Sequence, residues 1–230
     1  EEIKDILAFN FRDLASAGFY DILETIVEEN LTISSWPRVW VSLLAIKHFD
    51  SENISSELMN RIDKLLDKVK PVTISDKVNV YFNKNARIYL DVEDALNNYE
   101  KVNNAVYDLG KEIGLDKNNF ESNILLFDDT GLSTRVSFLA KGLYETFEDK
   151  EKLIYILLDN IGENNVRFFK EILSNLIGLY HEENQEKCFN LLDKIVESKK
   201  YNKYYLYLQL SYQLSSLDIK RIKKAIELGV

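Results

Sequence analysis

The chain has 230 residues, one cysteine, 8 glycines and 2 prolines, and its formal net charge is −9. This length allows one elongated domain or two compact ones, and the scarcity of glycine and proline disfavours folds that depend on tight turns. With Cys188 alone an internal disulfide is excluded, and no apolar run or N-terminal pattern indicates a membrane span or a signal peptide, so we expect a cytoplasmic protein.

Apolar residues at helical spacing predict four helices before residue 70, with the clearest stripe at residues 22–27. Two serines before Trp36 and Pro37 are typical of a helix start, with a serine as cap and the proline in the first turn. Pro71 is expected to stop the fourth helix. The predicted helices cover residues 3–9, 12–29, 37–48 and 55–69.

Residues 72–92 fit two patterns. The apolar side chains alternate with a period of two on either side of residues 83–86, which would suit a β-hairpin at residues 78–92. Several of the same side chains also fall on one helical phase, and the flanking segments are helical. We favour helix with a loop near residues 83–87 and keep the hairpin as the alternative.

A helix is predicted over residues 93–113, followed by a loop at residues 117–122 and a short apolar segment at residues 124–127. The run Asp128-Asp129-Thr130-Gly131 is the strongest loop signal in the chain. We therefore expect an irregular helical lobe over residues 1–130 and a regular helical-repeat lobe over residues 131–230.

The second lobe contains an internal sequence repeat. Leu157-Leu158-Asp159-Asn160-Ile161 recurs 34 residues later as Leu191-Leu192-Asp193-Lys194-Ile195. The same offset relates Ile172, Leu176 and Tyr180 to Leu206, Leu210 and Leu214. Helices are predicted over residues 132–146, 149–161, 165–180, 185–197, 202–214 and 218–228. Two apolar stripes per 34 residues are typical of stacked helix pairs, so the predicted fold is an all-α solenoid of antiparallel helix pairs, similar to HEAT or TPR repeats.

Sequence motifs for chemistry are scarce. The chain has no glycine-rich phosphate loop, and His181 lacks the second histidine that a zinc-protease helix needs at position 185. His48 and His181 lie at predicted helix ends, where capping or solvated roles are expected, and Cys188 lies on an apolar phase typical of the core. We expect no cofactor, no metal and no catalysis. An acidic metal-dependent site that combines Asp128, Asp129 and Glu182 is the enzymatic alternative.

The C-terminal end mixes tyrosines with lysines. Residues 199–230 carry a local charge of +5, and residues 1–198 carry −14. Aromatic residues beside lysines can anchor a protein partner, and the candidate partner-binding residues are Tyr201, Lys203, Tyr204 and Tyr205. Packing against a neighbouring repeat is the simpler explanation of the tyrosines. The acidic body favours a partner with basic segments and disfavours nucleic acid, which stays an alternative based on Lys199, Lys200 and residues 220–224.

Residues 132–230 also carry an order of short motifs. These are residues 138–143, residues 172–179, Leu191-Leu192-Asp193, Leu208-Gln209-Leu210 and residues 221–229. This order resembles the helical C-terminal regions of large bacterial NTPase-linked defence proteins, including signal-transducing NTPases of the STAND class. The resemblance implies a sensor or docking region without catalytic residues of its own. The missing initiator methionine and the helix that finishes at Gly229 also lead us to expect a fragment of a larger protein.

Overall fold

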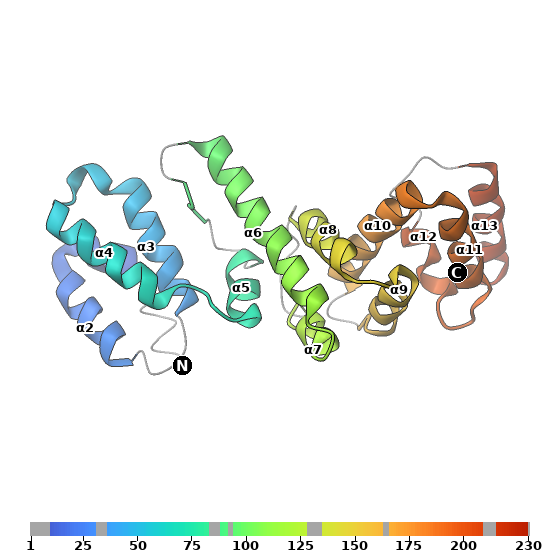
Figure 1. Cartoon of the computed structure of the whole chain (residues 1–230), viewed down its shortest axis with the longest axis horizontal. Helices are drawn as coiled ribbons and strands as arrows, with labels where there is room; N and C mark the ends of the chain where they lie inside the picture. Colours follow the sequence, from blue (N-terminus) through green and yellow to red (C-terminus); the bar gives the residue numbers. More distant parts are fainter. Residues whose placement is uncertain are drawn as a thin grey trace. The chain divides into compact units, whose positions relative to one another are not determined.

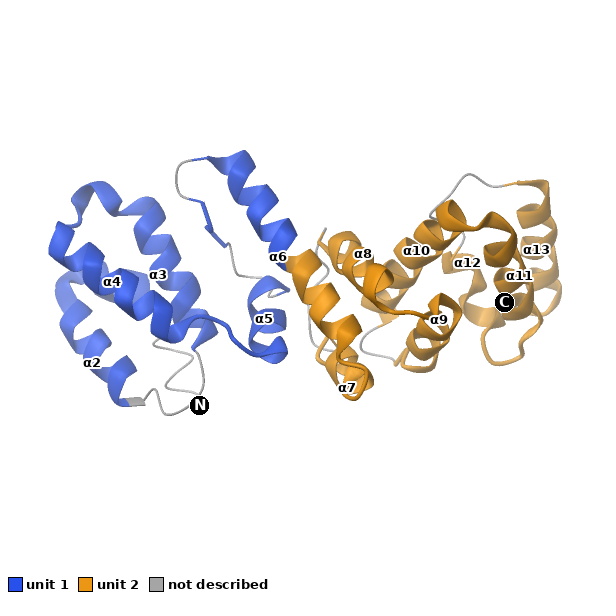
Figure 2. Cartoon of the chain, in the orientation of Figure 1, with its two compact units in different colours: residues 1–105 blue, residues 106–230 orange. Residues whose placement is uncertain are grey.

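The computed structural model describes residues 10–30, 36–82, 88–91, 94–127, 135–162, 166–208 and 215–229, and these residues form an all-helical structure without strands (Figure 1). The chain divides into two compact units, residues 1–105 and residues 106–230 (Figure 2). The boundary between them falls inside one helix, α6 (Ala95–Leu115). The loop that we expected to separate two lobes, residues 128–131, lies outside the described residues.

The first unit consists of short helices joined by short connections. It contains a helix at residues 10–14, the π-helical turn η1 (Ala15–Phe19), α2 (Tyr20–Asn30), α3 (Pro37–Phe49), the 3-10 turn η2 (Ser51–Asn53), α4 (Ser56–Val69), α5 (Ile74–Tyr81) and the first half of α6. Helix α3 packs against both α4 and α5. The hydrophobic core of the first unit is formed by Phe11, Tyr20, Leu23, Val27, Trp36, Val39, Leu43, Ile46, Ile62, Leu65 and Val69.

Helix boundaries in the first unit follow local signals. Ser55 caps α4 by accepting a hydrogen bond from the Leu58 amide at 3.2 Å, and α4 ends at Val69, before Pro71. The expected serine cap of α3 is wrong, because Trp36 occupies the cap position without a side-chain hydrogen bond. The continuous helix expected over residues 12–29 is also wrong, because Gly18 has a φ of 88° and interrupts it.

Helix α5 settles the described part of the ambiguous segment. Thr73 accepts a hydrogen bond from the Asp76 amide at 3.1 Å, and Asp76 accepts one from the Thr73 amide at 3.2 Å. This capping box starts a helix that continues to Tyr81, so the β-hairpin alternative is wrong for its first arm. The loop expected at residues 83–87 lies outside the described residues.

The second unit contains the rest of α6 and the helices that follow it. These are α7 (Phe120–Leu125), α8 (Val136–Thr146), α9 (Lys150–Asp159), α10 (Val166–Glu183), α11 (Gln185–Glu197), the 3-10 turn η3 (Asn202–Tyr204), α12 (Tyr205–Leu208) and α13 (Ser216–Glu227). Helix α10 packs against α8, α9, α11 and α12, and α13 packs against α11 and α12. The loop predicted over residues 117–122 is partly wrong, because α7 begins at Phe120.

The side chains at equivalent positions of the 34-residue repeat are buried alike only in part. Leu157 and Leu158 of α9 are buried, as are Leu191 and Leu192 of α11. The second stripe is different, because Leu206 is 36% exposed although Ile172, its counterpart, is fully buried. The turn η3 shifts the helical phase, so that Tyr205 and Leu208 point inward instead.

Helices α6 and α8 cross at very short range through glycines. A Cβ atom on Gly142 would lie 2.1 Å from the carbonyl oxygen of Tyr107 and 2.8 Å from the amide nitrogen of Lys111. A Cβ atom on Gly110 would lie 2.3 Å from the carbonyl oxygen of Leu139. Backbone therefore packs directly on backbone at this crossing, and no side chain fits between the two helices.

Candidate interaction surface

The four predicted partner-binding residues have different surroundings in the second unit. Lys203 is exposed, with its Nζ atom 4.8 Å from the ring centroid of the half-buried Tyr204. Tyr205 is fully buried and belongs to the core, so its ring is not accessible to a partner. Tyr205 therefore packs in the core and does not anchor a partner, because η3 shifts the helical phase.

Tyr201 links the segment after α11 to α9. Its hydroxyl donates a hydrogen bond to Asp159 Oδ1 at 2.7 Å, and its ring lies 5.5 Å from the ring of Tyr155, centroid to centroid. Lys200 forms an ion pair with the same aspartate. Hydrogen bonds from Lys200 and Tyr201 lower the pKa of Asp159, so this carboxylate stays ionised.

A groove of about 950 Å³ lies beside Tyr155, between α9 and the adjoining ends of α10 and α11. We call it the α9–α11 groove. It is lined by Glu148, Asp149, Lys150, Glu151, Lys152, Tyr155, Tyr180, Glu183, Asn184 and Lys187. The local sequence builds its ends, since Asp149 caps α9 and Asn184 caps α11, each by accepting a backbone amide hydrogen bond.

Tyrosine hydroxyls and carboxylates are paired around the α9–α11 groove. Tyr180 donates to Glu151 Oε1 at 3.3 Å, and Tyr144 donates to Glu183. Burial is the main cause, and the charge of Glu151 the second, that raises the pKa of Tyr180 to about 12. The Tyr180 hydroxyl therefore remains a donor at neutral pH. Lys194 of α11 reaches Glu151 of α9 at 3.2 Å and bridges the two helices.

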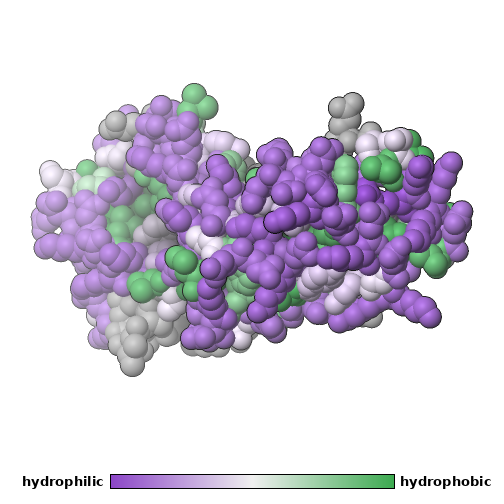
Figure 3. Space-filling view, turned by 45° about the vertical axis from the view of Figure 1, so that its right-hand side comes forward, coloured by the Kyte–Doolittle hydropathy of each residue, from purple (hydrophilic) through white to green (hydrophobic). Residues whose placement is uncertain are grey.

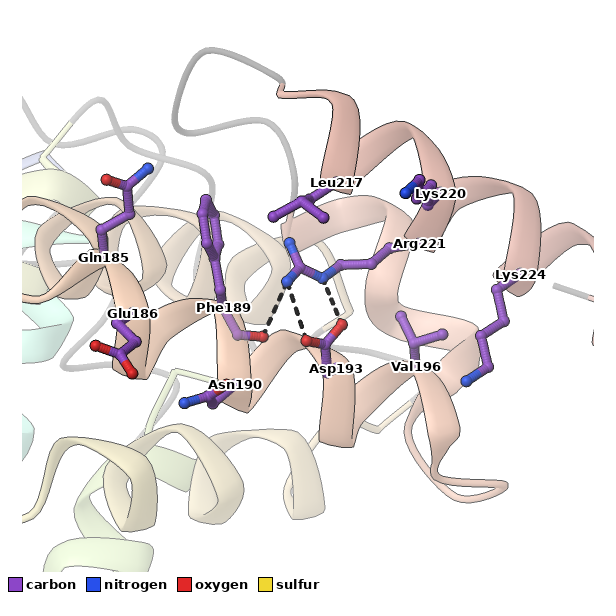
Figure 4. A pocket seen from close by; sticks show the side chains of 10 residues that line it. All are labelled: Gln185, Glu186, Phe189, Asn190, Asp193, Val196, Leu217, Lys220, Arg221 and Lys224. Atoms are coloured by element: carbon purple, nitrogen blue, oxygen red, sulfur yellow. Dashed lines mark hydrogen bonds and ion pairs between the residues drawn. The ribbon is translucent and has the colours of Figure 1, made fainter.

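A second groove of about 730 Å³ lies between α11 and α13 (Figure 4). We call it the α11–α13 groove. It is lined by Gln185, Glu186, Phe189, Asn190, Asp193, Val196, Leu217, Lys220, Arg221 and Lys224. Helix α11 therefore contributes side chains to both grooves, with Lys187 facing the first and Phe189 facing the second.

Arg221 joins the two walls of the α11–α13 groove and is only 6% exposed. Its Nε atom donates to Asp193 Oδ1 at 2.7 Å, and its Nη2 atom donates to Asp193 Oδ2 at 3.1 Å and to the Phe189 carbonyl at 3.3 Å (Figure 4). Nη1 donates to the buried Asp218 at 3.0 Å. The guanidinium carbon also lies 4.7 Å from the centroid of the Phe189 ring. These contacts hold α13 on α11 and keep the groove in one shape.

The accessible lining of the α11–α13 groove suits a polypeptide. Phe189 and Leu217 offer apolar surface, and the amide side chains of Gln185 and Asn190 form no side-chain hydrogen bond within the described part of the chain. A primary amide can donate to and accept from a peptide backbone at the same time. Apolar contact combined with a few convergent polar groups is the usual composition of a binding site.

The basic residues of the C-terminal end are partly neutralised within the unit. Lys200 pairs with Asp159, Arg221 with Asp193 and Asp218, and Lys224 with Glu197 at 2.7 Å. Three of the seven cationic groups between residues 199 and 224 are thus occupied by carboxylates. This pairing weakens the electrostatic argument for a nucleic-acid surface.

Among the described residues, no group of three or more His, Cys, Asp or Glu side chains could hold a metal ion. Asp128 and Asp129 of the acidic alternative lie outside the described residues, and Glu182 is exposed. Cys188 is fully buried, as its apolar phase indicated, and burial raises the pKa of its thiol to about 12. His48 and His181 occupy the last turns of α3 and α10.

None of the four predicted partner-binding residues lines either groove, so sequence reasoning did not find the groove residues. Tyr155 and Phe189 fall beside buried positions of their helices, so each looks like part of an apolar stripe. The one available signal was the aspartate of the repeated pentapeptide. Asp159 forms an ion pair with Lys200, and Asp193 forms one with Arg221. Both ion pairs lie next to the grooves.

Among the described residues, no helix is both long enough and apolar enough to cross a membrane. Comparison of the chain with protein-family models, curated proteins and solved structures finds no match.

Proposed function

We propose that the second unit is a helical-repeat module that recognises another polypeptide on the surface formed by α9, α11 and α13. The observation that carries this proposal is the pair of neighbouring grooves to which α11 contributes on both sides. Extended surfaces between stacked helices suit binding through many moderate contacts.

The helix contacts support a repeat of helix pairs. Helix α10 packs against α8 and α12, two helices before and after it, as well as against its neighbours α9 and α11. Helix α11 in turn packs against α13. Contacts between each helix and both the next helix and the one after it are what a solenoid of antiparallel pairs requires.

Four carboxylates against three lysines line the α9–α11 groove, so its net charge favours a partner segment with lysine or arginine. Tyr155 offers an aromatic ring beside Tyr201, and the carboxylates of Glu151 and Glu183 lie at the groove. A cationic side chain gains both cation–π and ion-pair interactions in such surroundings. The net charge of −9 would also attract a basic segment from a distance.

The resemblance of residues 132–230 extends the proposal to a biological setting. On that resemblance alone, the module would be the sensor or docking part of a bacterial defence or signalling protein, with catalysis located elsewhere.

The proposal is tested by selecting peptides from a random displayed library with the immobilised chain. Wild type should enrich peptides that contain basic residues and bind with micromolar affinity. Tyr155→Ala, Tyr201→Ala and Phe189→Ala should each weaken binding of a selected peptide about tenfold when its contact is a binding hot spot, and at least one of them must do so.

The matched control is Phe138→Ala, because Phe138 is also a half-buried phenylalanine of this unit but lines neither groove. This variant should bind like wild type. Enrichment of no peptide, or unchanged affinity in Tyr155→Ala, Tyr201→Ala and Phe189→Ala alike, contradicts the proposal. A steep loss of binding to single-stranded DNA with salt, without peptide binding, would favour the nucleic-acid alternative.

A further inference from the structure

Helix α13 turns charged side chains toward the interior of the second unit. Asp218 is fully buried, Arg221 is 6% exposed, and Ala225 is the one fully buried apolar residue of the helix. Asp218 also completes a capping box, because its Oδ2 atom accepts from the Ser215 amide at 2.8 Å. Docking of α13 therefore depends on ion pairs and hydrogen bonds more than on apolar burial.

As a result, the larger apolar side chains of this region remain in solvent. Leu217, Ile219, Ile226 and Leu228 are 46%, 51%, 60% and 51% exposed. Single exposed apolar residues are ordinary, but four of them within twelve residues form an unusual concentration. Figure 3 shows that hydrophobic side chains interrupt a largely hydrophilic surface on the face that it presents.

Three isoleucines of α13 share one side of the helix. Ile219, Ile222 and Ile226 are spaced i, i+3 and i+7, which places them in one stripe along the axis. Ile222 is half-buried and the other two are more than half exposed. We call this the isoleucine stripe. It lies on the opposite side of α13 from Leu217 and Lys224, which line the α11–α13 groove.

Positive charge borders the isoleucine stripe. Going round the helix from the stripe, Lys223 comes next and Lys220 follows, and neither forms an ion pair with another described residue. Glu227, the one acidic residue on the exposed side of α13, follows Lys223 by one turn and lies on this same edge. The accessible side of this helix is thus apolar along one edge, and the next edge carries a net positive charge from two lysines and one glutamate.

We infer that the isoleucine stripe binds an acidic amphipathic helix of a partner protein. Apolar residues of such a helix at i, i+3 and i+7 would cover the isoleucines, and its glutamates or aspartates would meet Lys220 and Lys223. A second copy of the chain fits poorly, because paired α13 helices would bring the same lysines together. The isoleucine stripe lies on the opposite side of α13 from the α11–α13 groove, and Lys220, at the edge between them, also lines that groove.

The test uses two synthetic helical peptides with the same leucine stripe, one flanked by glutamate and the other by lysine. Fluorescence anisotropy is measured with the full chain at moderate salt. The acidic peptide should bind at least tenfold more tightly than the basic peptide. Ile226→Glu should weaken its binding at least tenfold, and Lys223→Glu should reduce the preference for the acidic peptide.

Leu96→Glu is the matched control, because Leu96 is a 77% exposed leucine on α6, and this variant should bind the acidic peptide as wild type does. Circular dichroism verifies that the variants keep their helices. Equal affinity for the two peptides overturns the inference, as does unchanged binding in Ile226→Glu. Concentration-dependent dimerisation that Ile226→Glu abolishes would also overturn it, in favour of a second copy as the occupant.

Discussion

The buried tyrosines differ in whether their hydroxyls have a partner. Tyr144 donates a hydrogen bond to Glu183. The hydroxyls of Tyr20 and Tyr205 are buried and have no hydrogen-bond partner among the described residues. Burial of an unpaired hydroxyl costs about 1–3 kcal/mol, so these two side chains keep a polar atom that their surroundings do not use. Their rings nevertheless fill the core of each unit.

This difference predicts opposite effects for the same substitution. Tyr205→Phe should raise the free energy of unfolding by about 1 kcal/mol, because it removes an unpaired polar atom and keeps the ring. Tyr144→Phe should lower it by about 1 kcal/mol, because Glu183 loses a donor. Urea denaturation followed by circular dichroism measures both variants against wild type. A loss of stability in Tyr205→Phe as large as that in Tyr144→Phe would contradict the prediction.

At the scale of elements, the α6–α8 crossing should be the contact least tolerant of an added methyl group. Gly142→Ala would place a Cβ atom 2.1 Å from the Tyr107 carbonyl oxygen, so one helix has to move. We expect the free energy of unfolding to fall by about 1–3 kcal/mol, despite the better helix propensity of alanine. Thermal and urea denaturation provide the measurement.

Lys141→Ala is the control for this crossing, because Lys141 is the exposed neighbour of Gly142 on the same helix. It should change the free energy of unfolding by less than about 0.5 kcal/mol. If Gly142→Ala is as stable as this control, the two helices are not in backbone contact.

Helices could be predicted wherever the ends carried side-chain signals. Ser55 and Pro71 bracket α4 and predicted its bounds, whereas helix was favoured over residues 72–92 from its apolar phase and helical flanks, without the capping box at Thr73 that begins α5. Prediction failed where one residue changes the phase or the backbone. Gly18 breaks an apolar stripe that looks continuous, and η3 turns Tyr205 inward in place of Leu206. Such effects depend on backbone angles and tertiary packing, and the spacing of apolar residues in the sequence does not reveal these.

At the scale of the whole molecule, stability should decrease in alkaline solution. The pKa of Cys188 is raised from about 9 to about 12 by burial, and that of Tyr180 is raised to about 12. Unfolding lowers both pKa values, so the unfolded chain releases protons that the folded chain retains. Their contribution is therefore complete below about pH 8.5 and is lost as the pH rises toward 12.

We expect the Cys188 thiol to account for about 1 kcal/mol of lost stability between pH 8 and pH 10. Urea denaturation at several pH values should show a smaller decrease for Cys188→Ala than for wild type, whatever its stability at pH 7. Parallel pH profiles for the two proteins would contradict this assignment.

The candidate surface was less predictable than the helices. Tyr201 was proposed as a partner-binding residue because lysines surround it in the chain, but it lines neither groove. The grooves could not be predicted, because their walls are joined by side chains far apart in the chain, such as Glu151 with Lys194, 43 residues later, and Asp193 with Arg221, 28 residues later. Only the repeated Leu-Leu-Asp motif hinted at this pairing, and it did not reveal which cation each aspartate binds.

The glycine crossing has a consequence for recognising related chains. Apolar residues in the buried stripe of a helix replace one another readily. Their pattern therefore indicates a helix but does not show common descent. Gly110 and Gly142 face backbone atoms, and no other residue type fits there unless the helices separate. A chain of common descent that keeps this crossing must therefore keep glycine at both positions. Gly110 and Gly142, 32 residues apart, form a short sequence signature for finding such chains.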